Sequence, residues 1–197
     1  MLDLHASESH PDGNEVDVYV NDSHHHEDRH LEEEFSSSPI PTWVGNEERN
    51  LLAADEKFVS GLTPNVIVAK DGSDDFTNIL AALDALPETY SGRYVIYQEG
   101  VYEETVNITN RMANITMYGD GSKMSIITGS KSIAIDTGGD RFMATRLGIR
   151  NMAGEEKQQA LALWVKSDRS IFFNIRIEGN QDTLFAQGEK DKRERWE

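Results

Sequence analysis

The sequence predicts an all-β protein, a right-handed parallel β-helix (partial) with a short N-terminal capping helix. Strand-like runs follow one another about every 10–15 residues after position 94, with little helical periodicity. Short motifs recur after roughly 20–28 residues, which is typical of a coil in a fold of stacked strand repeats. An immunoglobulin-like sandwich also has many short strands. The recurrence, and a single helix ahead of the strands, favour the β-helix.

The N-terminal segment differs from the rest of the chain in charge. Residues 1–48 hold 13 acidic residues and one basic residue, a net −12, and residues 49–197 hold 22 acidic and 18 basic residues, a net −4, which together give −16. All six histidines lie in the first 30 residues. We expect residues 1–42 to form a disordered acidic tail, 43–63 a linker, and 64–197 the β-helix. His24 to His26 could hold a metal ion weakly, but a solvated tail is the simpler interpretation.

The composition excludes several kinds of chemistry. The chain has no cysteine, and residues 64–197 have no histidine, so a Ser-His-Asp triad, a Cys-His pair and a His or Cys zinc site are excluded there. We expect no metal and no cofactor. Positive charge is not clustered, which argues against a nucleic-acid partner. No apolar run is long enough to span a membrane, and the first residues lack the pattern of a signal peptide.

The elements are expected in the following order. Val66 to Ala69 is a β-rich run, and Asp71-Gly72-Ser73 forms a turn. Asp74 or Asp75 can then N-cap a helix. That helix has an apolar face with spacings of three and four and ends at Pro87; the face consists of Phe76, Ile79, Leu80, Leu83 and Leu86. A polar-backed helix of this kind suits the end of an open β-stack.

The predicted strands follow the helix, separated by Gly, Asp or Asn. They are Tyr94 to Tyr97, Thr105 to Ile108, Ile115 to Tyr118, Ser125 to Thr128, Ile133 to Ile135, Phe142 to Ile149, Ala160 to Val165 and Ile171 to Ile177. Within them Arg146-Leu147-Gly148-Ile149 is echoed by Asn174-Ile175-Arg176-Ile177. We interpret the echo as the same position on two coils.

The candidate site lies between Gln159 and Leu184. Gln159 and Gln181 are 22 residues apart, about one coil, and Asp182 follows the second glutamine. On successive coils the two amides and the carboxyl group could meet, because neighbouring strands lie roughly 4.8 Å apart. Two amide donors suit the binding of an oxyanion, and a carboxyl group can move a proton, so the set fits acyl transfer. The alternative is that these side chains only cap turns.

Residues 64 to about 187 resemble plant pectin methylesterases. The resemblance rests on short motifs in a common order: Val66 to Ser73, Arg93 to Tyr97, Gly100 to Glu104, Gly119-Asp120-Gly121, Ile126 to Ser130, Asn151-Met152-Ala153-Gly154 and the two glutamine motifs. Upstream, Trp43-Val44 and Arg49 to Leu52 resemble the junction at which the family's inhibitor-like pro-region is cleaved.

The resemblance implies a parallel β-helix enzyme that hydrolyses methyl esters of galacturonate units in pectin and releases methanol without a metal. Asp182 then corresponds to the general acid, Gln181 to an oxyanion stabiliser and Gln159 to a substrate contact. It further implies methylated homogalacturonan as the substrate, a proteinaceous pectinesterase inhibitor as a partner, and an extracellular location in the cell wall.

The sequence departs from the family pattern in several places. The nucleophilic aspartate of an Asp-Phe-Ile-Phe-Gly motif is expected about one coil after Asp182, near position 203, and the later substrate arginine is expected beyond it. The segment between Ser130 and Phe142 is about ten residues shorter than in the family. We therefore expect the 197 residues to lack a complete active site, and the last coil to expose an apolar cross-section.

Two other functions are open. A non-catalytic β-helix remnant could bind a polysaccharide or a protein partner, although the acidic tail would repel polygalacturonate. A lyase or glycosidase acting on the same polymer would need clustered acids for calcium or two carboxylates placed across the bond, and neither pattern is evident.

Overall fold

The computed structural model describes residues 59–131, 133–153, 161–179 and 183–186, together with the backbone of two strands near the N-terminus. The described ranges contain helix α3 and strands β3 to β14. Their bounds are β3 (Val66–Ala69), α3 (Ile79–Asp84), β4 (Tyr94–Glu99), β5 (Val101–Glu103), β6 (Val106–Ile108), β7 (Ile115–Tyr118), β8 (Ile126–Gly129), β9 (Ile133–Thr137), β10 (Met143–Thr145), β11 (Gly148–Asn151), β12 (Leu161–Val165), β13 (Ser170–Glu178) and β14 (Leu184–Ala186).

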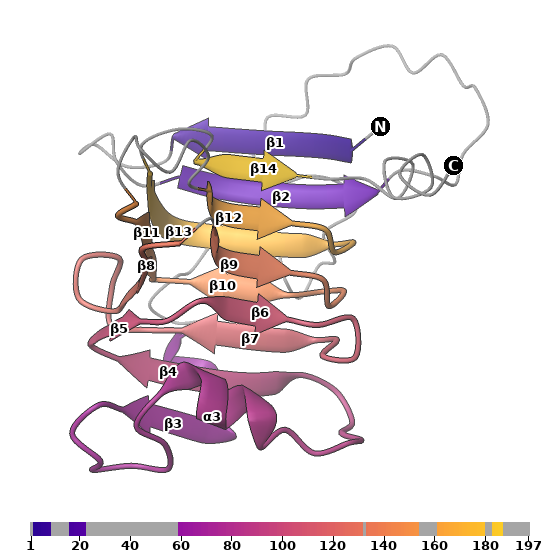
Figure 1. Ribbon diagram of the computed structural model, residues 1–197. Helices are drawn as coiled ribbons and strands as arrows, with labels where there is room; N and C mark the ends of the chain where they lie inside the picture. Colours follow the sequence, from indigo (N-terminus) through magenta and orange to yellow (C-terminus); the bar gives the residue numbers. More distant parts are fainter. Residues whose placement is uncertain are drawn as a thin grey trace.

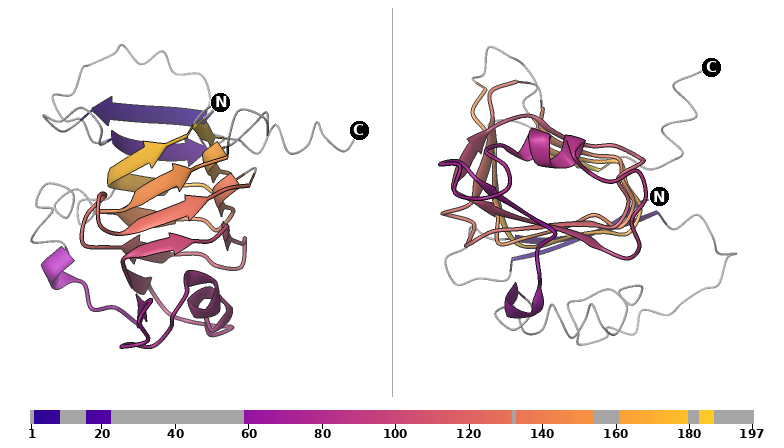
Figure 2. Two further views of the ribbon diagram at one scale, coloured as in Figure 1. Left: turned by 60° about the vertical axis from the view of Figure 1, so that its left-hand side comes forward. Right: turned by 90° about the horizontal axis from the view of Figure 1, so that it is seen from below.

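These strands stack into a parallel β-helix with three faces (Figure 1, Figure 2). The first face consists of β3, β4, β7, β10 and the first half of β13. The second face consists of β5, β8, β11 and the second half of β13. The third face consists of β6, β9, β12 and β14. Every pairing among the strands β3 to β14 is parallel, so the β-helix predicted from the sequence is confirmed.

The register explains the repeated motif in the sequence. Met143 pairs with Ile171 and Gly148 with Arg176, in both cases 28 residues apart (171 − 143 and 176 − 148). Arg146 and Asn174 occupy the same corner of successive coils, with φ angles of 55° and 51°. The Arg146 amide donates to the Asn174 carbonyl at 3.1 Å. The echo between 146–149 and 174–177 is therefore one coil stacked on the next.

Apolar side chains in register fill the interior of the stack. One such column runs through the first face and consists of Val66, Ile96, Met117, Ala144 and Phe172. Phe172 is fully buried, and its ring centroid lies 5.7 Å from that of Phe142. Because each strand alternates its side chains between inside and outside, every inward column has an outward column beside it. The polar, charged and aromatic side chains of the outer surface stand in the outward columns.

Helix α3 lies at the β3 end of the stack (Figure 1) and buries Ile79, Ala82 and Leu83. The helix was predicted, but its N-cap was not. Asn78 is the N-cap, and its side chain accepts a hydrogen bond from the Ala81 amide at 2.8 Å. Asp75 instead accepts from the Ile67 amide at 2.9 Å and so fastens the segment before the helix to β3. The predicted cap at Asp74 or Asp75 is therefore wrong.

The N-terminal segment contains two strands where the sequence predicted disorder. They are β1 (Leu2–Glu8) and β2 (Val16–Asp22), which pair with each other antiparallel. Strand β2 also pairs antiparallel with β13, for example Val18 with Phe172. Within this acidic segment apolar and polar residues alternate, as in Val16-Asp17-Val18, and such alternation is typical of a strand. Of the predicted linker 43–63, residues 43–58 lie outside the described residues.

Candidate active site

The third face brings together the strands that follow the two glutamine motifs. Gln159 precedes β12, while Gln181 and Asp182 precede β14. The two strands are neighbours, with Leu163 paired to Leu184. The expectation that the motifs lead into successive coils is therefore confirmed for the strands. Gln159, Gln181 and Asp182 themselves lie outside the described residues, so their roles stay predictions.

The pairing is irregular just after Asp182. The Thr183 carbonyl accepts hydrogen bonds from two successive amides of β12, those of Ala162 at 3.1 Å and Leu163 at 3.0 Å. A regular parallel ladder spaces its bonds evenly, with a single N–H to each carbonyl. A local departure of this kind is what Gln181 and Asp182 need in order to face one site, because adjacent residues of a regular strand point to opposite sides.

Asn151 holds the base of the segment that carries Gln159. Its side-chain amide donates to the Lys131 and Leu161 carbonyls, both at 2.8 Å, and its side-chain oxygen accepts from the Ala153 amide at 2.9 Å. The residue is only 3% exposed. One side chain thus ties the end of β11 and the start of β12 to the loop after β8. The resemblance singled out Asn151 as part of a motif but gave no role for it.

An outward row crosses the third face beside this edge. Strand register places its members side by side, and they are Asn107, Asp136, Trp164 and Phe185. The Trp164 and Phe185 ring centroids are 6.1 Å apart in an edge-to-face arrangement, and Phe185 is 44% exposed. Aromatic faces with polar neighbours suit a ligand that has both apolar and hydroxylated surfaces, such as a sugar ring.

Lys166 ties the polar and aromatic parts of this row together. Its ammonium lies 2.6 Å from Asp136 Oδ2 and 3.8 Å from the centroid of the Trp164 ring. Asp136 Oδ1 and Trp164 Nε1 are buried and have no hydrogen-bond partner among the described residues. A buried polar atom without a partner destabilises the fold. The row is therefore only partly satisfied by the described residues.

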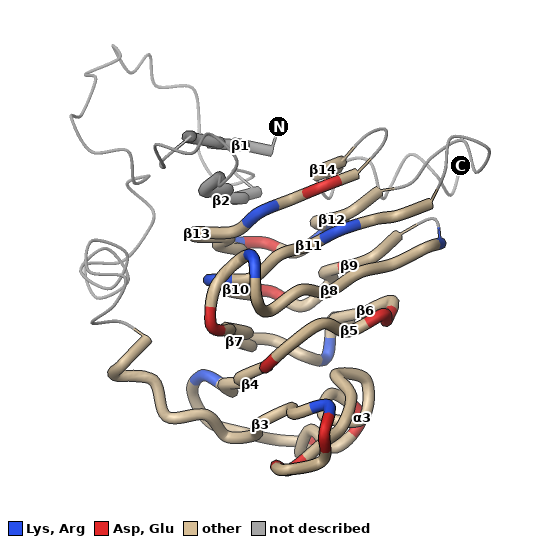
Figure 3. Tube along the Cα trace, turned by 90° about the vertical axis from the view of Figure 1, so that its left-hand side faces the viewer, with Lys and Arg blue, Asp and Glu red and all other residues tan. Residues whose placement is uncertain are grey.

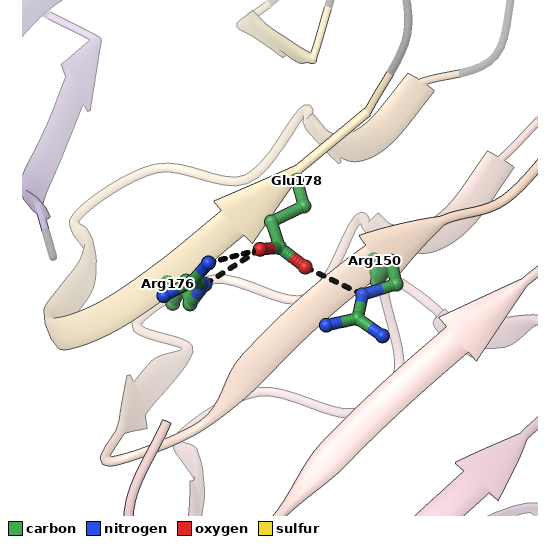
Figure 4. Close-up of polar contacts among 3 residues, drawn as sticks. All are labelled: Arg150, Arg176 and Glu178. Carbon is green, nitrogen blue, oxygen red and sulfur yellow. Dashed lines mark hydrogen bonds and ion pairs between the residues drawn. The ribbon is translucent and has the colours of Figure 1, made fainter. Parts of the chain in front are cut away.

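The second face carries a different arrangement (Figure 4). Glu178 Oε2 accepts from Arg150 Nε at 2.5 Å, and Glu178 Oε1 accepts from Arg176 Nε at 2.6 Å. Burial raises the pKa of the Glu178 carboxyl, but the hydrogen bonds and positive charges of Arg176 and Arg150 outweigh it and bring the pKa below its ordinary value. Along the described coils acidic and basic residues are interspersed (Figure 3). Two ion pairs join neighbouring coils, Arg150 with Glu178 and Lys166 with Asp136.

The described residues offer no metal centre and no membrane span. They contain no group of three or more His, Asp or Glu residues placed to hold an ion. No helix among them is long and apolar enough to cross a bilayer.

Sequence reasoning missed the outward row. The signal was present in Leu163-Trp164-Val165, where a large aromatic residue stands between two inward-facing apolar residues. Its partners could not be inferred without the register, since Asp136 and Lys166 are 30 residues apart.

Comparison with known proteins agrees with this architecture. The family model described as pectinesterase matches residues 65–193. A protein of Arabidopsis thaliana named "Probable pectinesterase/pectinesterase inhibitor 13" is 51% identical over 158 residues, which cover 75% of this chain and 25% of the relative. "Pectinesterase 4" of the same plant is 37% identical, over 80% of this chain and 30% of the relative.

Solved structures show the same likeness. "Pectin methylesterase from Carrot" matches with a TM-score of 0.60 at 39% identity, over 63% of this chain and 42% of that one. "Pectin methylesterase PemA from Erwinia chrysanthemi" matches with a TM-score of 0.58 at 27% identity. The chain spans about a quarter to a third of the length of the curated relatives. On its family match, its fold and the strands that follow its glutamine motifs, this chain belongs to the pectinesterase family.

Proposed function

We propose that the third face takes part in the hydrolysis of galacturonate methyl esters in pectin, with release of methanol. The observation that carries the proposal is the β12–β14 pairing, which brings the segments after Gln159 and after Asp182 onto neighbouring coils. In the proposed reaction Gln159 contacts the substrate, Gln181 stabilises the oxyanion, and Asp182 protonates the departing methoxide.

The covalent step needs a further carboxylate. A nucleophilic aspartate attacks the ester carbon, the methoxide leaves with a proton from Asp182, and water then hydrolyses the acyl intermediate. By resemblance this aspartate belongs one coil after Asp182, near position 203, and so is not among the 197 residues. The 197 residues by themselves, tested without that aspartate, should bind methylated pectin and hydrolyse it orders of magnitude more slowly than a protein that has the nucleophile.

The proposed setting follows from the proposed substrate. A protein that acts on methylated homogalacturonan would meet it outside the cell, in the cell wall. A pectinesterase inhibitor is the proposed protein partner, since several relatives carry pectinesterase inhibitor in their names.

The test is methanol release from highly methylated pectin, together with binding of a methylated oligogalacturonate, for the wild-type chain and for Asp182→Asn and Gln181→Ala. We expect binding by the wild-type chain, very slow methanol release, and still slower release after Asp182→Asn or Gln181→Ala, because both side chains act on the transition state. Fast release that Asp182→Asn leaves unchanged would contradict the proposed roles. Binding with no detectable release would favour the alternative of a non-catalytic binding protein.

A further inference from the structure

A depression of about 500 Å³ lies along one edge of the third face, where strands β6, β9 and β12 end. It is lined by the ends of β6 and β9 and by the residue after β12, and the lining includes Asn107, Asn110, Arg111, Asp136, Gly138 and Lys166. Gln159 and Asp182 precede β12 and β14, whereas Lys166 follows β12. The five residues of β12 separate the two places by roughly 16 Å, at 3.3 Å per residue.

The floor of the depression depends on a glycine. A Cβ atom at Gly138 would lie 2.5 Å from Asn110 Oδ1 and 3.2 Å from the Ile108 carbonyl oxygen, so a side chain at this position would displace the Asn110 amide. The amides of Gly138 and Gly139 both donate to the Ile108 carbonyl, at 2.6 Å and 3.1 Å. These bonds hold the end of β6 against the turn after β9. The space is thus kept open by a tightly held backbone.

The rim of the depression carries two cationic side chains, Arg111 and Lys166. The Met112 amide donates to the Thr109 carbonyl at 2.8 Å and closes a tight turn around Arg111, which is exposed. Lys166 is held between Asp136 and the Trp164 ring. Arg111 and Lys166 against Asp136 give the lining a net charge of +1, whereas residues 49–197 as a whole are net negative.

The groups around this space fit one class of ligand. A guanidinium group binds a carboxylate through two parallel hydrogen bonds, with a geometry that a lysine lacks. The Asn107 and Asn110 amides can both donate and accept, as ring hydroxyls require. A methyl ester would remove the negative charge that Arg111 recognises.

We propose that this depression binds an unesterified uronate unit, with Arg111 holding the free carboxylate and the two asparagines contacting the ring hydroxyls. The inference rests on the proposed function, because it takes the ligand from the same polymer. It gives the third face two subsites of different preference, one for a methyl ester near Gln181 and one for a free acid at the opposite ends of the strands.

The test is an NMR titration of the 197-residue chain with a fully de-esterified galacturonate trimer and, separately, with the same trimer fully methyl-esterified. We expect the de-esterified trimer to shift the Asn110, Arg111 and Gly138 amide signals, and added salt to weaken its binding. Arg111→Gln should weaken that binding about tenfold or more, the effect of losing a charged hydrogen-bond donor. The affinity of Arg111→Lys for the de-esterified trimer should lie between those of the wild type and Arg111→Gln.

The matched control is Lys123→Gln, which removes the same charge from the exposed turn between β7 and β8. It should leave the affinity unchanged. Equal losses in Arg111→Gln and Lys123→Gln would overturn the subsite, and so would absence of signal shifts with the de-esterified trimer or equal affinity for the esterified one. The proposed function fails separately, if the methyl-esterified trimer leaves the Leu161 to Leu163 and Thr183 to Phe185 signals unmoved.

Discussion

Two outward rows on the same scaffold differ in how completely their polar groups are paired. Both rows run across stacked parallel strands, with one residue from each coil. The row on the second face is Glu103, Thr128, Arg150 and Glu178, and the row on the third face is Asn107, Asp136, Trp164 and Phe185. In the first of these Glu178 joins two arginines by hydrogen bonds through both of its oxygens. In the second, Asp136 Oδ1 and Trp164 Nε1 have no hydrogen-bond partner within the part of the chain that the structure describes.

This difference in the pairing of polar groups helps to locate functional positions on a repetitive fold. Strand register alone aligns residues on every face, so alignment does not distinguish a site. A row whose charges neutralise one another stabilises the stack. A row with unsatisfied polar atoms, an exposed ring and an adjoining depression carries a cost that is typical of functional positions. The following substitutions separate the two kinds of row.

Phe172→Ala should destabilise the scaffold that carries both rows. Phe172 is fully buried in the shared interior, so the variant should lose about 3–5 kcal/mol of unfolding free energy. Urea denaturation measures the loss. Phe185→Ala is the control, because Phe185 is 44% exposed and its removal should cost far less. Equal losses in the two variants would contradict the assigned interior.

Asn151→Ala should act on the edge that carries Gln159. It removes three hydrogen bonds from a side chain that is 3% exposed, which should cost roughly 2–4 kcal/mol. Limited proteolysis should then cut between residues 152 and 160 faster than in the wild type. Asn107→Ala, at an exposed position, should change neither stability nor cleavage. Unchanged cleavage in Asn151→Ala would show that this residue does not hold the segment between β11 and β12 in place.

Lys166→Met tests the polar part of the third-face row. The Asp136 carboxylate would lose its ammonium partner while only 18% exposed, at a cost of about 1–3 kcal/mol. Asp136→Asn in the same background should recover part of that loss, since the uncompensated charge would then be absent. A double-mutant cycle from thermal unfolding measures the coupling. A coupling near zero would mean that this ion pair contributes nothing.

Glu178→Gln should have the smallest effect, about 0.5–1 kcal/mol, because the second-face ion pairs are partly exposed. The folded-state pKa of Glu178 lies below its ordinary value of 4.5. Its contribution is therefore present above pH 4.5 and is lost as the pH falls through the folded-state pKa. Melting curves should show a larger wild-type advantage at pH 7 than at pH 3, because the carboxylate becomes protonated as the pH falls. Glu103→Gln is the control in the same row.

The sequence was sufficient for much of the fold. Short strands with apolar residues such as Ile96, Met117 and Phe172 were recognisable in the sequence. Their apolar side chains form the interior of the stack. The motif at 146–149 and 174–177 reported one coil length correctly. Strands β1 and β2 were not predicted, because the acidic composition of residues 1–42 indicates disorder. The short alternation of apolar and polar residues there is the weaker signal. Asn78 was missed as the cap because Asp75 is drawn to β3 by a contact that sequence alone does not reveal.

The candidate site was predictable only in part. The two glutamine motifs stand about one coil apart in sequence, and the strands that follow them are neighbours. The Asp136–Lys166 pair and the row through Trp164 depend on the register between coils. On this face the separation of paired residues varies from 21 residues for Leu163 and Leu184 to 29 for Asn107 and Asp136. A pair separated by a variable coil length cannot be read from spacing alone.

The most direct test of the account is an amide chemical-shift map of the 197-residue chain with a methyl-esterified oligogalacturonate. We expect the largest shifts at Leu161 to Leu163 and at Thr183 to Phe185, the strands that follow the glutamine motifs. The second-face residues Thr128, Arg150 and Glu178 should not move. Shifts centred on the second face, or none at saturating ligand, would contradict the assignment of the site to the third face.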